Sequence, residues 1–272
     1  MPKRWRLTLK TFFRISVQSF ASAFNKYNLR TRAYIARRIH LGLKEYVTVY
    51  ASLVNSDVLP IFSNLNVRAS QARDDEYERL ALLPAPYDFD GDMSNIAAQA
   101  EEKGIVYYTT MTALRQTTLT LHAIGLFHIL EQHLAELCHD GSFGIAPPSD
   151  TKLSVVQEWF KKNYGIDFAS FPAWPEIEKL RLLANTAKHG EGGSEMKLRE
   201  IWPQIFEDQS MKEILPEFPY MYTSTRLRLP LAGKDLFVTE IVYKEIATSV
   251  LAFVEQIFSH FKDRPNDLYV DG

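Results

Sequence analysis

The sequence predicts a mainly α-helical protein, built as a helical bundle with long antiparallel helices. Apolar residues recur at helical spacing along most of the chain, and glycine or proline marks the ends of the periodic stretches. The chain has 272 residues and a hydrophobic content of 46%, which is enough to bury a large core. A charged fraction of 24% is typical of a folded protein rather than a disordered one.

The charge is distributed unevenly. Residues 1–44 contain eleven of the 31 basic residues and no acidic residue, so the rest of the chain carries 20 basic against 33 acidic residues. A basic arm on an acidic body indicates an anionic partner, a contact between arm and body, or a targeting peptide. The basic stretch continues through Arg37 and Arg38 into a helix with a core-like pattern, which favours the first two interpretations.

The first helices follow from the apolar spacing. Phenylalanines and a valine at helical intervals predict a helix over about 5–25, and a similar pattern predicts a second over about 31–54. Asn55-Ser56-Asp57 and Pro60 mark the end of the second helix. We therefore expect a basic N-terminal helical region over residues 1–64.

Residues 65–104 are predicted as a loop-rich connector. Prolines 84 and 86 precede an Asp-Phe-Asp-Gly-Asp cluster at residues 88–92, which is loosely similar to a calcium-binding loop. The cluster lacks the remaining spacing of such a loop and its closing glutamate. We expect a solvated loop here and no bound metal.

The remaining chain is predicted as a helical bundle over residues 105–264. Its longest helix covers about 106–139, where leucines recur at helical intervals. A shorter helix is predicted at about 152–164, ended by Gly165. The C-terminal helix is predicted at about 239–262.

A small β-hairpin is the predicted exception to the helical pattern, near residues 222–238. The sequence Thr-Arg-Leu-Arg-Leu alternates between polar and apolar residues, as a half-buried strand does. Ala232-Gly233-Lys234-Asp235 has the composition of a turn. We expect two short strands joined at that turn.

Several classes of protein are excluded by composition and motifs. The one cysteine, Cys138, excludes an intramolecular disulfide framework and a cysteine-rich zinc site, and favours a reducing, cytoplasmic location. No apolar run approaches the roughly 20 residues of a membrane-spanning helix. Nucleophile-elbow, phosphate-loop and dinucleotide glycine patterns are absent, so we expect no cofactor.

Four histidines lie on the predicted helix 106–139: His122, His128, His133 and His139. His122 and His133 are eleven residues apart, as are the other two, and eleven residues return a side chain to the same face about 16 Å along the axis. That distance is too long for a shared metal ion. We expect hydrogen-bonded core or surface histidines rather than ligands.

One predicted helix, running from about Pro175 to His189 and ending before Gly190, has a chemically suggestive polar side. Its apolar residues gather on the other side: Ile177, Leu180, Ala184 and Ala187. Arg181, Asn185 and His189 follow one another at i,i+4 spacing, so they line one ridge, with Lys188 beside it. Such a ridge could bind a phosphodiester, with His189 moving protons and a cation offsetting charge. The alternative is an ordinary helix end, which also favours Lys and His before Gly.

Glu131 is a further candidate. It follows the apolar sequence Leu126-Phe-His-Ile-Leu130, where a carboxylate must be paired, hydrogen-bonded or at a boundary. The alternative is a glutamate at the edge of the helix that faces water.

The segment Leu182-Leu-Ala-Asn-Thr-Ala-Lys-His-Gly190, taken with the Glu131 helix, resembles the HEPN superfamily of helical bundles over about residues 105–190. Members commonly have a long helix with an inward polar residue, often Glu, followed later by Arg-Asn-x-x-x-His. Asn185 and His189 fall on the Asn and His of this pattern, and Glu131 on the acidic residue.

The chain departs from the HEPN pattern at Ala184, where the family usually has Arg. Arg181 lies one turn earlier and could substitute from there. Equally, this could be a member that keeps the fold and has lost or changed the chemistry.

The resemblance implies a metal-independent RNase of bacterial antiviral defence or toxin–antitoxin systems, acting as a homodimer. The RNA 2′-hydroxyl would attack its neighbouring phosphate, with His189 as general acid or base, Arg181 stabilising charge, Asn185 orienting and Lys188 binding substrate. The basic arm, residues 1–44, could contact RNA phosphates. The alternative is a non-enzymatic helical interaction subunit of a larger defence or nucleic-acid-bound complex, docked through that arm.

Overall fold

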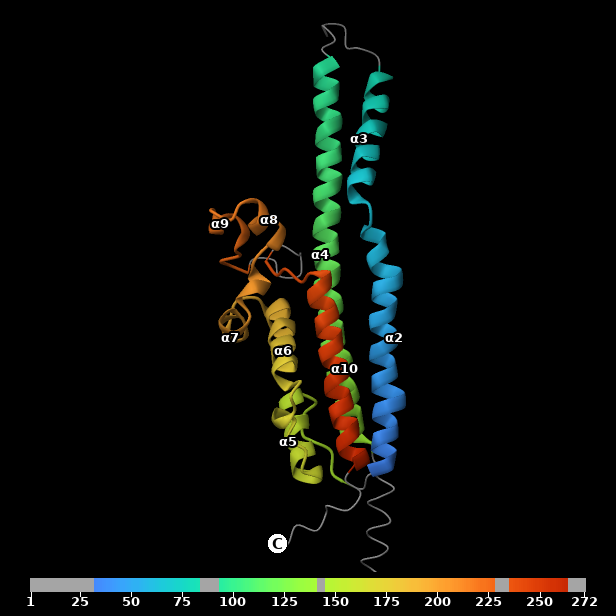
Figure 1. Ribbon diagram of the computed structural model, residues 1–272, viewed down its shortest axis with the longest axis vertical. Coiled ribbons are helices and arrows are strands. Elements are labelled where there is room, and N and C mark those ends of the chain that lie inside the picture. Colours follow the sequence, from blue (N-terminus) through green and yellow to red (C-terminus); the bar gives the residue numbers. More distant parts are fainter. Residues whose placement is uncertain (1–31, 84–92, 141–144, 228–234, 264–272) are drawn as a thin grey trace, which may run out of the picture. The chain divides into compact units, whose positions relative to one another are not determined.

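The computed structural model of the chain describes residues 32–83, 93–140, 145–227 and 235–263, and the predicted helix 5–25 lies outside these ranges (Figure 1). Regular structure within the ranges is helical, which confirms the mainly α prediction. Residues 32–38 are helical, and the further α-helices are α2 (Glu45–Leu53), α3 (Leu65–Ala81), α4 (Met93–His139), α5 (Leu153–Tyr164), α6 (Trp174–His189), α7 (Gly193–Ile201), α8 (Gln209–Ile214), α9 (Pro219–Tyr222) and α10 (Glu240–Asp263). None of these helices has the length and the apolar character that crossing a bilayer demands.

The chain divides into two compact units. The first comprises residues 1–48, 129–174 and 251–272, and the second comprises residues 49–128 and 175–250. The units are interleaved along the sequence, and α2, α4 and α10 each contribute residues to both.

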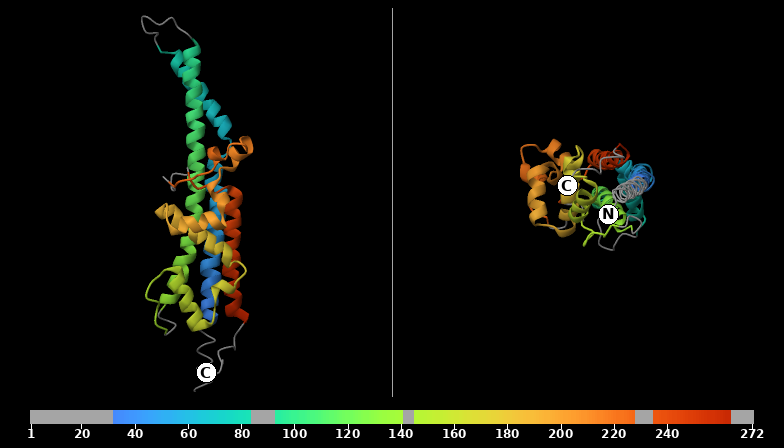
Figure 2. Two further views of the ribbon diagram at one scale, coloured as in Figure 1. Left: turned by 90° about the vertical axis from the view of Figure 1, so that its left-hand side faces the viewer. Right: turned by 90° about the horizontal axis from the view of Figure 1, so that it is seen from below.

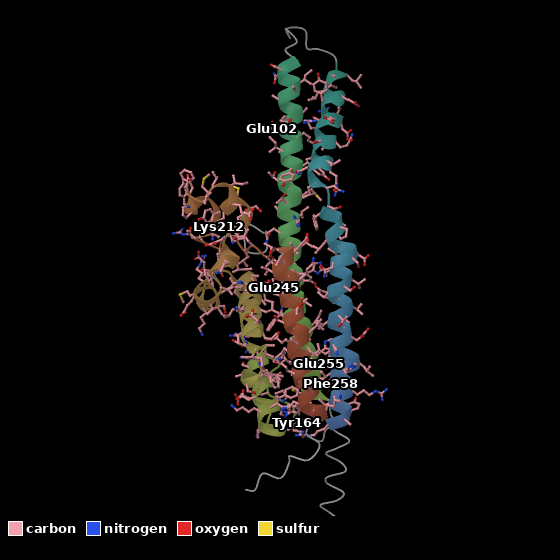
Figure 3. The ribbon with its side chains drawn as sticks, viewed as in Figure 1. Glu102, Tyr164, Lys212, Glu245, Glu255 and Phe258 are labelled. Atoms are coloured by element: carbon pink, nitrogen blue, oxygen red, sulfur yellow. The ribbon has the colours of Figure 1, made fainter. Side chains whose placement is uncertain are left out.

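The first unit has an aromatic core. Three phenylalanines of this core are fully buried: Phe160 of α5, Phe253 of α10, and Phe168, which follows α5. The ring of Phe168 lies edge-on to that of Phe253, with the two centroids 5.3 Å apart. Gly165 ends α5 in the left-handed region, at φ 68°, as the sequence predicts. On the same part of α10, Glu255, which is labelled in Figure 3, forms an ion pair with Lys44 at 2.7 Å.

In the second unit, α3 lies antiparallel to the first part of α4, side by side in both Figure 1 and the left view of Figure 2. The Arg68 guanidinium lies 5.6 Å from the ring centroid of Tyr107, and Arg73 lies 3.7 Å from the Glu101 carboxylate. A side chain at Gly104 would come within 3.1 Å of a backbone oxygen of α3, so glycine permits this close approach. The predicted loop-rich connector, residues 65–104, is therefore mostly helical where the structure describes it.

The predicted β-hairpin near 222–238 is wrong for the residues that the structure describes, and residues 228–234 lie outside them. Tyr222 ends helix α9, and Thr223 forms a single antiparallel bridge to Glu207. The backbone N–H of Phe237 donates to the Ile205 carbonyl at 2.7 Å. Backbone groups at the two described ends of the predicted hairpin, Thr223 and Phe237, therefore bond to the segment after α7.

Candidate functional site

Helix α6 presents the predicted polar ridge, which we define as Arg181, Asn185, Lys188 and His189. Residues elsewhere on the helix surface are buried: Ile177, Leu180, Leu182, Leu183, Ala184, Thr186 and Ala187. Burial of these side chains fixes the helix, since each one removes apolar surface from water. The ridge is therefore a polar edge on an otherwise buried helix.

The C-terminal end of α6 agrees with the sequence prediction. Gly190 has a φ of 71°, and its N–H donates to the Thr186 carbonyl at 2.8 Å. The basic residues Lys188 and His189 lie in the last turn, where positive charge complements the helix dipole. This end is thus ordinary in geometry, and its chemistry depends on what the ridge side chains contact.

Arg181 is engaged with Glu178, three residues earlier on the same helix. Its Nη2 lies 2.8 Å from Glu178 Oε2 and its Nε lies 3.1 Å from Oε1, a two-point contact. The two side chains are 32% and 31% exposed. Partly exposed pairs of this kind contribute about 0.3–0.5 kcal/mol, so the pair holds Arg181 only weakly.

The other three residues of the ridge are free to meet a ligand. Asn185 is half-buried, whereas Lys188 and His189 are exposed. Within the described parts of the chain, their side chains form no hydrogen bond or ion pair. An amide, an ammonium and an imidazole group therefore stand on one helix edge with their polar atoms available.

Glu131, the predicted acidic companion, belongs to the first unit, whereas the polar ridge belongs to the second. Its Oε1 accepts a hydrogen bond from the backbone N–H of Leu153 at 3.3 Å. Leu153 is the first residue of α5, where backbone N–H groups lack partners within the helix. Glu131 thus stabilises the start of α5, with its negative charge at the favourable end of the helix.

Three of the four histidines of α4 have hydrogen-bonding partners, as the sequence predicts. His122 Nδ1 lies 2.8 Å from the Tyr50 hydroxyl. The Nδ1 atoms of His133 and His139 lie 2.9 and 2.8 Å from the carbonyl oxygens four residues earlier. Among the described residues, no group of three or more His, Cys, Asp or Glu side chains could hold a metal ion.

Two features of the structure were not predicted from the sequence. The Glu178 contact of Arg181 could have been found, because the i,i+3 spacing is visible in the sequence. The second is a polar cluster in the second unit, where Tyr50 contacts His122 and also interacts with the fully buried Tyr243. Burial, with a smaller contribution from Tyr50, raises the pKa of Tyr243. A glycine at position 125 within a helical pattern is the only sequence signal for this cluster.

Comparisons of the chain with protein-family models, with characterised proteins and with solved structures found no match.

Proposed function

We propose that this chain is a HEPN-like, metal-independent endoribonuclease and that the polar ridge of α6 is its catalytic surface. The observation that supports the proposal is the availability of Asn185, Lys188 and His189, which bond to nothing else in the described ranges while the helix beneath them is buried. Lys188 and His189 also suit an ordinary helix end, whereas Asn185 on the same edge is not required by one.

The proposed reaction is an internal transesterification. The RNA 2′-oxygen forms a bond to the adjacent phosphorus, and the bond from phosphorus to the 5′-oxygen breaks. His189 takes the proton from the 2′-hydroxyl while water protonates the departing 5′-oxygen, or His189 protonates the 5′-oxygen while water takes the proton of the 2′-hydroxyl. Lys188 and Arg181 offset the extra negative charge of the transition state, and Asn185 orients the phosphate through its amide. The products are a 2′,3′-cyclic phosphate and a 5′-hydroxyl.

Arg181 must leave Glu178 to reach a phosphate. The cost is small, because a partly exposed pair contributes only about 0.3–0.5 kcal/mol, whereas a guanidinium can make two parallel hydrogen bonds to a phosphate. Replacing Glu178 with Gln removes the competing charge. We expect the Glu178→Gln variant to bind RNA more tightly than the wild type, and Arg181→Ala to bind more weakly.

The proposal is tested by measuring cleavage of a fluorescently labelled single-stranded RNA. His189→Ala should lower the rate about 10²–10⁴-fold, the usual effect of losing a proton-transferring group. His139→Ala is the matched control, because His139 is also an exposed histidine at the last position of a helix. The catalytic proposal fails if the His189 and His139 variants cleave RNA at the same rate as the wild type.

A non-enzymatic interaction subunit is the second candidate, and specific observations favour it. Two of the side chains that the resemblance makes catalytic, Glu131 and Arg181, hold contacts with other groups of this chain. Ala184, at the position where the family usually has Arg, is fully buried. This candidate expects purified wild-type protein to cleave no RNA. It also expects Lys188→Ala and its control on α7, Lys197→Ala, to behave alike in RNA binding.

A further inference from the structure

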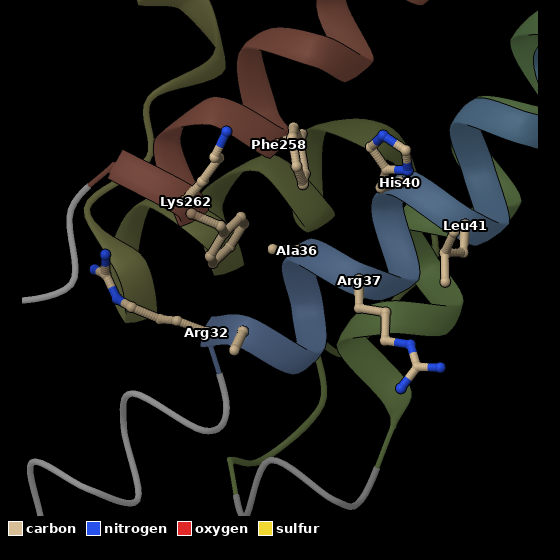
Figure 4. A pocket seen from close by; sticks show the side chains of 9 residues that line it. Arg32, Ala36, Arg37, His40, Leu41, Phe258 and Lys262 are labelled. Atoms are coloured by element: carbon tan, nitrogen blue, oxygen red, sulfur yellow. The ribbon is translucent and has the colours of Figure 1, made fainter.

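Each unit contains a groove lined by its own residues. In the first unit, a groove lies between residues 32–41 and the end of α10, beside the rings of His40 and Phe258 (Figure 4). In the second unit, a groove of about 280 Å³ lies between residues 66–73 of α3 and residues 101–108 of α4. The walls of this second groove are regular helix, so helix geometry fixes the positions of its lining side chains.

The groove of the second unit lies where α3 and α4 approach closely. A Cβ atom on Gly104 would lie 3.1 Å from the Ala69 carbonyl oxygen, so the two backbones nearly touch at this point. Small residues at such a contact leave a hollow that larger side chains flank. The flanking side chains on α4 are Ile105 and Tyr108, which are 56% and 41% exposed. The surface therefore offers both a hollow and exposed apolar side chains beside it.

The stretch of α4 that carries the groove has no charge on any side. From Gly104 to Leu114 the sequence contains no Asp, Glu, Lys or Arg. Ile105, Val106 and Tyr108 point to three different sides of the helix, and each is about half exposed. A helix without a charged side is typical of a buried position. This stretch therefore has more apolar surface than α3 alone covers.

The other long helix that contacts α4 in this unit begins beyond the uncharged stretch. The first residue of α10, Glu240, forms an ion pair with Arg115 at 2.6 Å, and Gln116 donates to two carbonyls of the segment that leads into α10. Among the described helices of the second unit, α3 is the one that lies beside residues 104–114 in Figure 1 and in the left view of Figure 2. Two antiparallel helices form half of a four-helix bundle, which a second pair completes.

We propose that the α3–α4 pair of one chain packs antiparallel against the same pair of a second copy of the chain. The two-fold axis of this dimer passes near residue 106 of α4. Tyr108 of each copy then fills the hollow over Gly104 of the other, because positions 108 and 104 are equally far from position 106. The same surface is used on both copies, as in most symmetric dimers.

The charges of the surface are compatible with this arrangement. Residues 101–103 of α4 are charged, and in the proposed dimer they face the uncharged residues 109–111 of the other copy. Arg73 and Glu101 lie 3.7 Å apart within one copy, so each already has an opposite charge nearby. No like charges on α4 therefore meet across the axis. A strongly charged partner would lose hydration against the uncharged stretch, which is unfavourable, whereas a second copy brings an uncharged stretch of its own.

The size of the surface suits a dimer. α3 has 17 residues, and a helix of that length is about 25 Å long, while two packed helices are about 20 Å wide. The face therefore covers about 500 Å² on each copy, and two copies bury about 1,000 Å² together, which is the area that a specific interface needs.

The oligomeric state of the full-length protein tests the proposal. Sedimentation equilibrium should show a reversible dimer of the wild type. Ile105→Asp places a charge near the centre of the interface and should raise the dissociation constant at least about tenfold. Ile241→Asp is the matched control, because Ile241 is 70% exposed on α10 outside the proposed surface, and it should dimerise as the wild type does. A wild type that stays monomeric up to its solubility limit would assign the surface to a different partner and overturn the proposal.

A second pair of variants removes the tyrosine that fills the hollow. Tyr108→Ala keeps a good helix former on α4 and should also raise the dissociation constant at least about tenfold. Tyr220→Ala, which removes a tyrosine that is 75% exposed on α9, should leave the dissociation constant unchanged. Circular dichroism should show that both variants keep the helical content of the wild type. A dimer that tolerates both Ile105→Asp and Tyr108→Ala forms through another surface, and the proposal is then wrong.

Cross-linking of engineered cysteines tests the position of the axis. In the proposed dimer the two copies of position 105 lie about 3 Å apart along the helices, and the two copies of position 98 lie about 24 Å apart. Bismaleimidoethane should therefore join Ile105→Cys into a covalent dimer and leave Ala98→Cys, exposed on the same helix, as monomers. The wild type should give no product, because Cys138 is buried. Equal cross-linking of the two variants would contradict the antiparallel arrangement. The surface shares no residue with the polar ridge of α6, so these results are independent of the ribonuclease test.

Discussion

Gly125 of α4 is where a single methyl group should have a large effect on stability. The Tyr50 hydroxyl, which contacts His122, lies directly over Gly125. A Cβ at this position would overlap the hydroxyl oxygen and lie 3.1 Å from the Tyr50 Cζ atom. Gly125→Ala must therefore displace the tyrosine ring or the helix.

The change in the free energy of unfolding caused by Gly125→Ala has three contributions. Overpacking of this kind costs about 1–3 kcal/mol. Loss of the Tyr50–His122 hydrogen bond costs about 1 kcal/mol more. Alanine is favoured over glycine inside a helix by about 1 kcal/mol, which offsets the second contribution. We expect Gly125→Ala to lower the free energy of unfolding by about 1–3 kcal/mol.

Urea denaturation followed by circular dichroism measures this change. Gly42→Ala is the matched control, because Gly42 is also helical and a Cβ there meets no atom within 4 Å. It should be neutral or stabilise by up to about 1 kcal/mol. In a Tyr50→Phe background the hydroxyl is gone, so Gly125→Ala should cost less than in the wild type. Equal costs in the two backgrounds would refute the steric explanation.

Three further predictions concern a half-buried histidine, a buried cysteine and a half-buried arginine. Burial lowers the pKa of His122 below 6.5, so the unfolded state binds the proton more readily and the free energy of unfolding falls as the pH drops below about that value. His122→Asn should therefore make the urea midpoint less dependent on pH between pH 8 and 5. An unchanged dependence would contradict this. Burial raises the pKa of the Cys138 thiol to about 12. In the native protein this thiol should therefore not react with dithiobis(nitrobenzoate) at pH 8 until urea unfolds the chain. Rapid reaction of the native protein would refute this prediction. Arg199 donates hydrogen bonds to Glu195 and, at 2.7 Å, to the Ser224 carbonyl. Arg199→Lys should therefore lower the free energy of unfolding, measured by urea denaturation, by about 1–3 kcal/mol. An unchanged urea midpoint would show that these contacts do not stabilise the fold.

Helix ends were the most predictable part of the fold. Gly165 and Gly190 both adopt positive φ at the residue after a helix, and glycine has this freedom whatever surrounds it. The helix over Leu65–Ala81 was missed, because its sequence is strongly charged and has little apolar periodicity. It depends on contacts with α4, such as that of Arg73 with Glu101, which lie outside any local pattern.

The predicted hairpin failed for a related reason. An alternating sequence indicates which side chains are buried, and Leu227, Leu236 and Val238 are indeed buried. It does not indicate which groups form hydrogen bonds with the backbone of the segment. Here the Gln116 side chain of α4 donates to the Leu236 and Val238 carbonyls at 3.0 and 3.2 Å, so an irregular segment satisfies its polar groups without a second strand.

The candidate site was predictable only within one helix. The i,i+4 spacing of Arg181, Asn185 and His189 fixes the ridge, since helical geometry alone makes these residues neighbours. The contact of Glu131 with the start of α5 joins residues 22 apart, and its partner is a backbone group with no sequence signature. Local spacing therefore predicted the ridge but did not indicate the hydrogen-bonding partner of Glu131.

The most direct test of the proposed ribonuclease is the chemistry of its product ends. Purified protein should be incubated with an RNA of defined sequence and with the same RNA carrying 2′-O-methyl groups throughout, both in the presence of EDTA. We expect a 2′,3′-cyclic phosphate and a 5′-hydroxyl from the first RNA, no cleavage of the second, and loss of the reaction in His189→Ala. Products with a 5′-phosphate, or equal cleavage of the methylated RNA, would contradict attack by the 2′-hydroxyl.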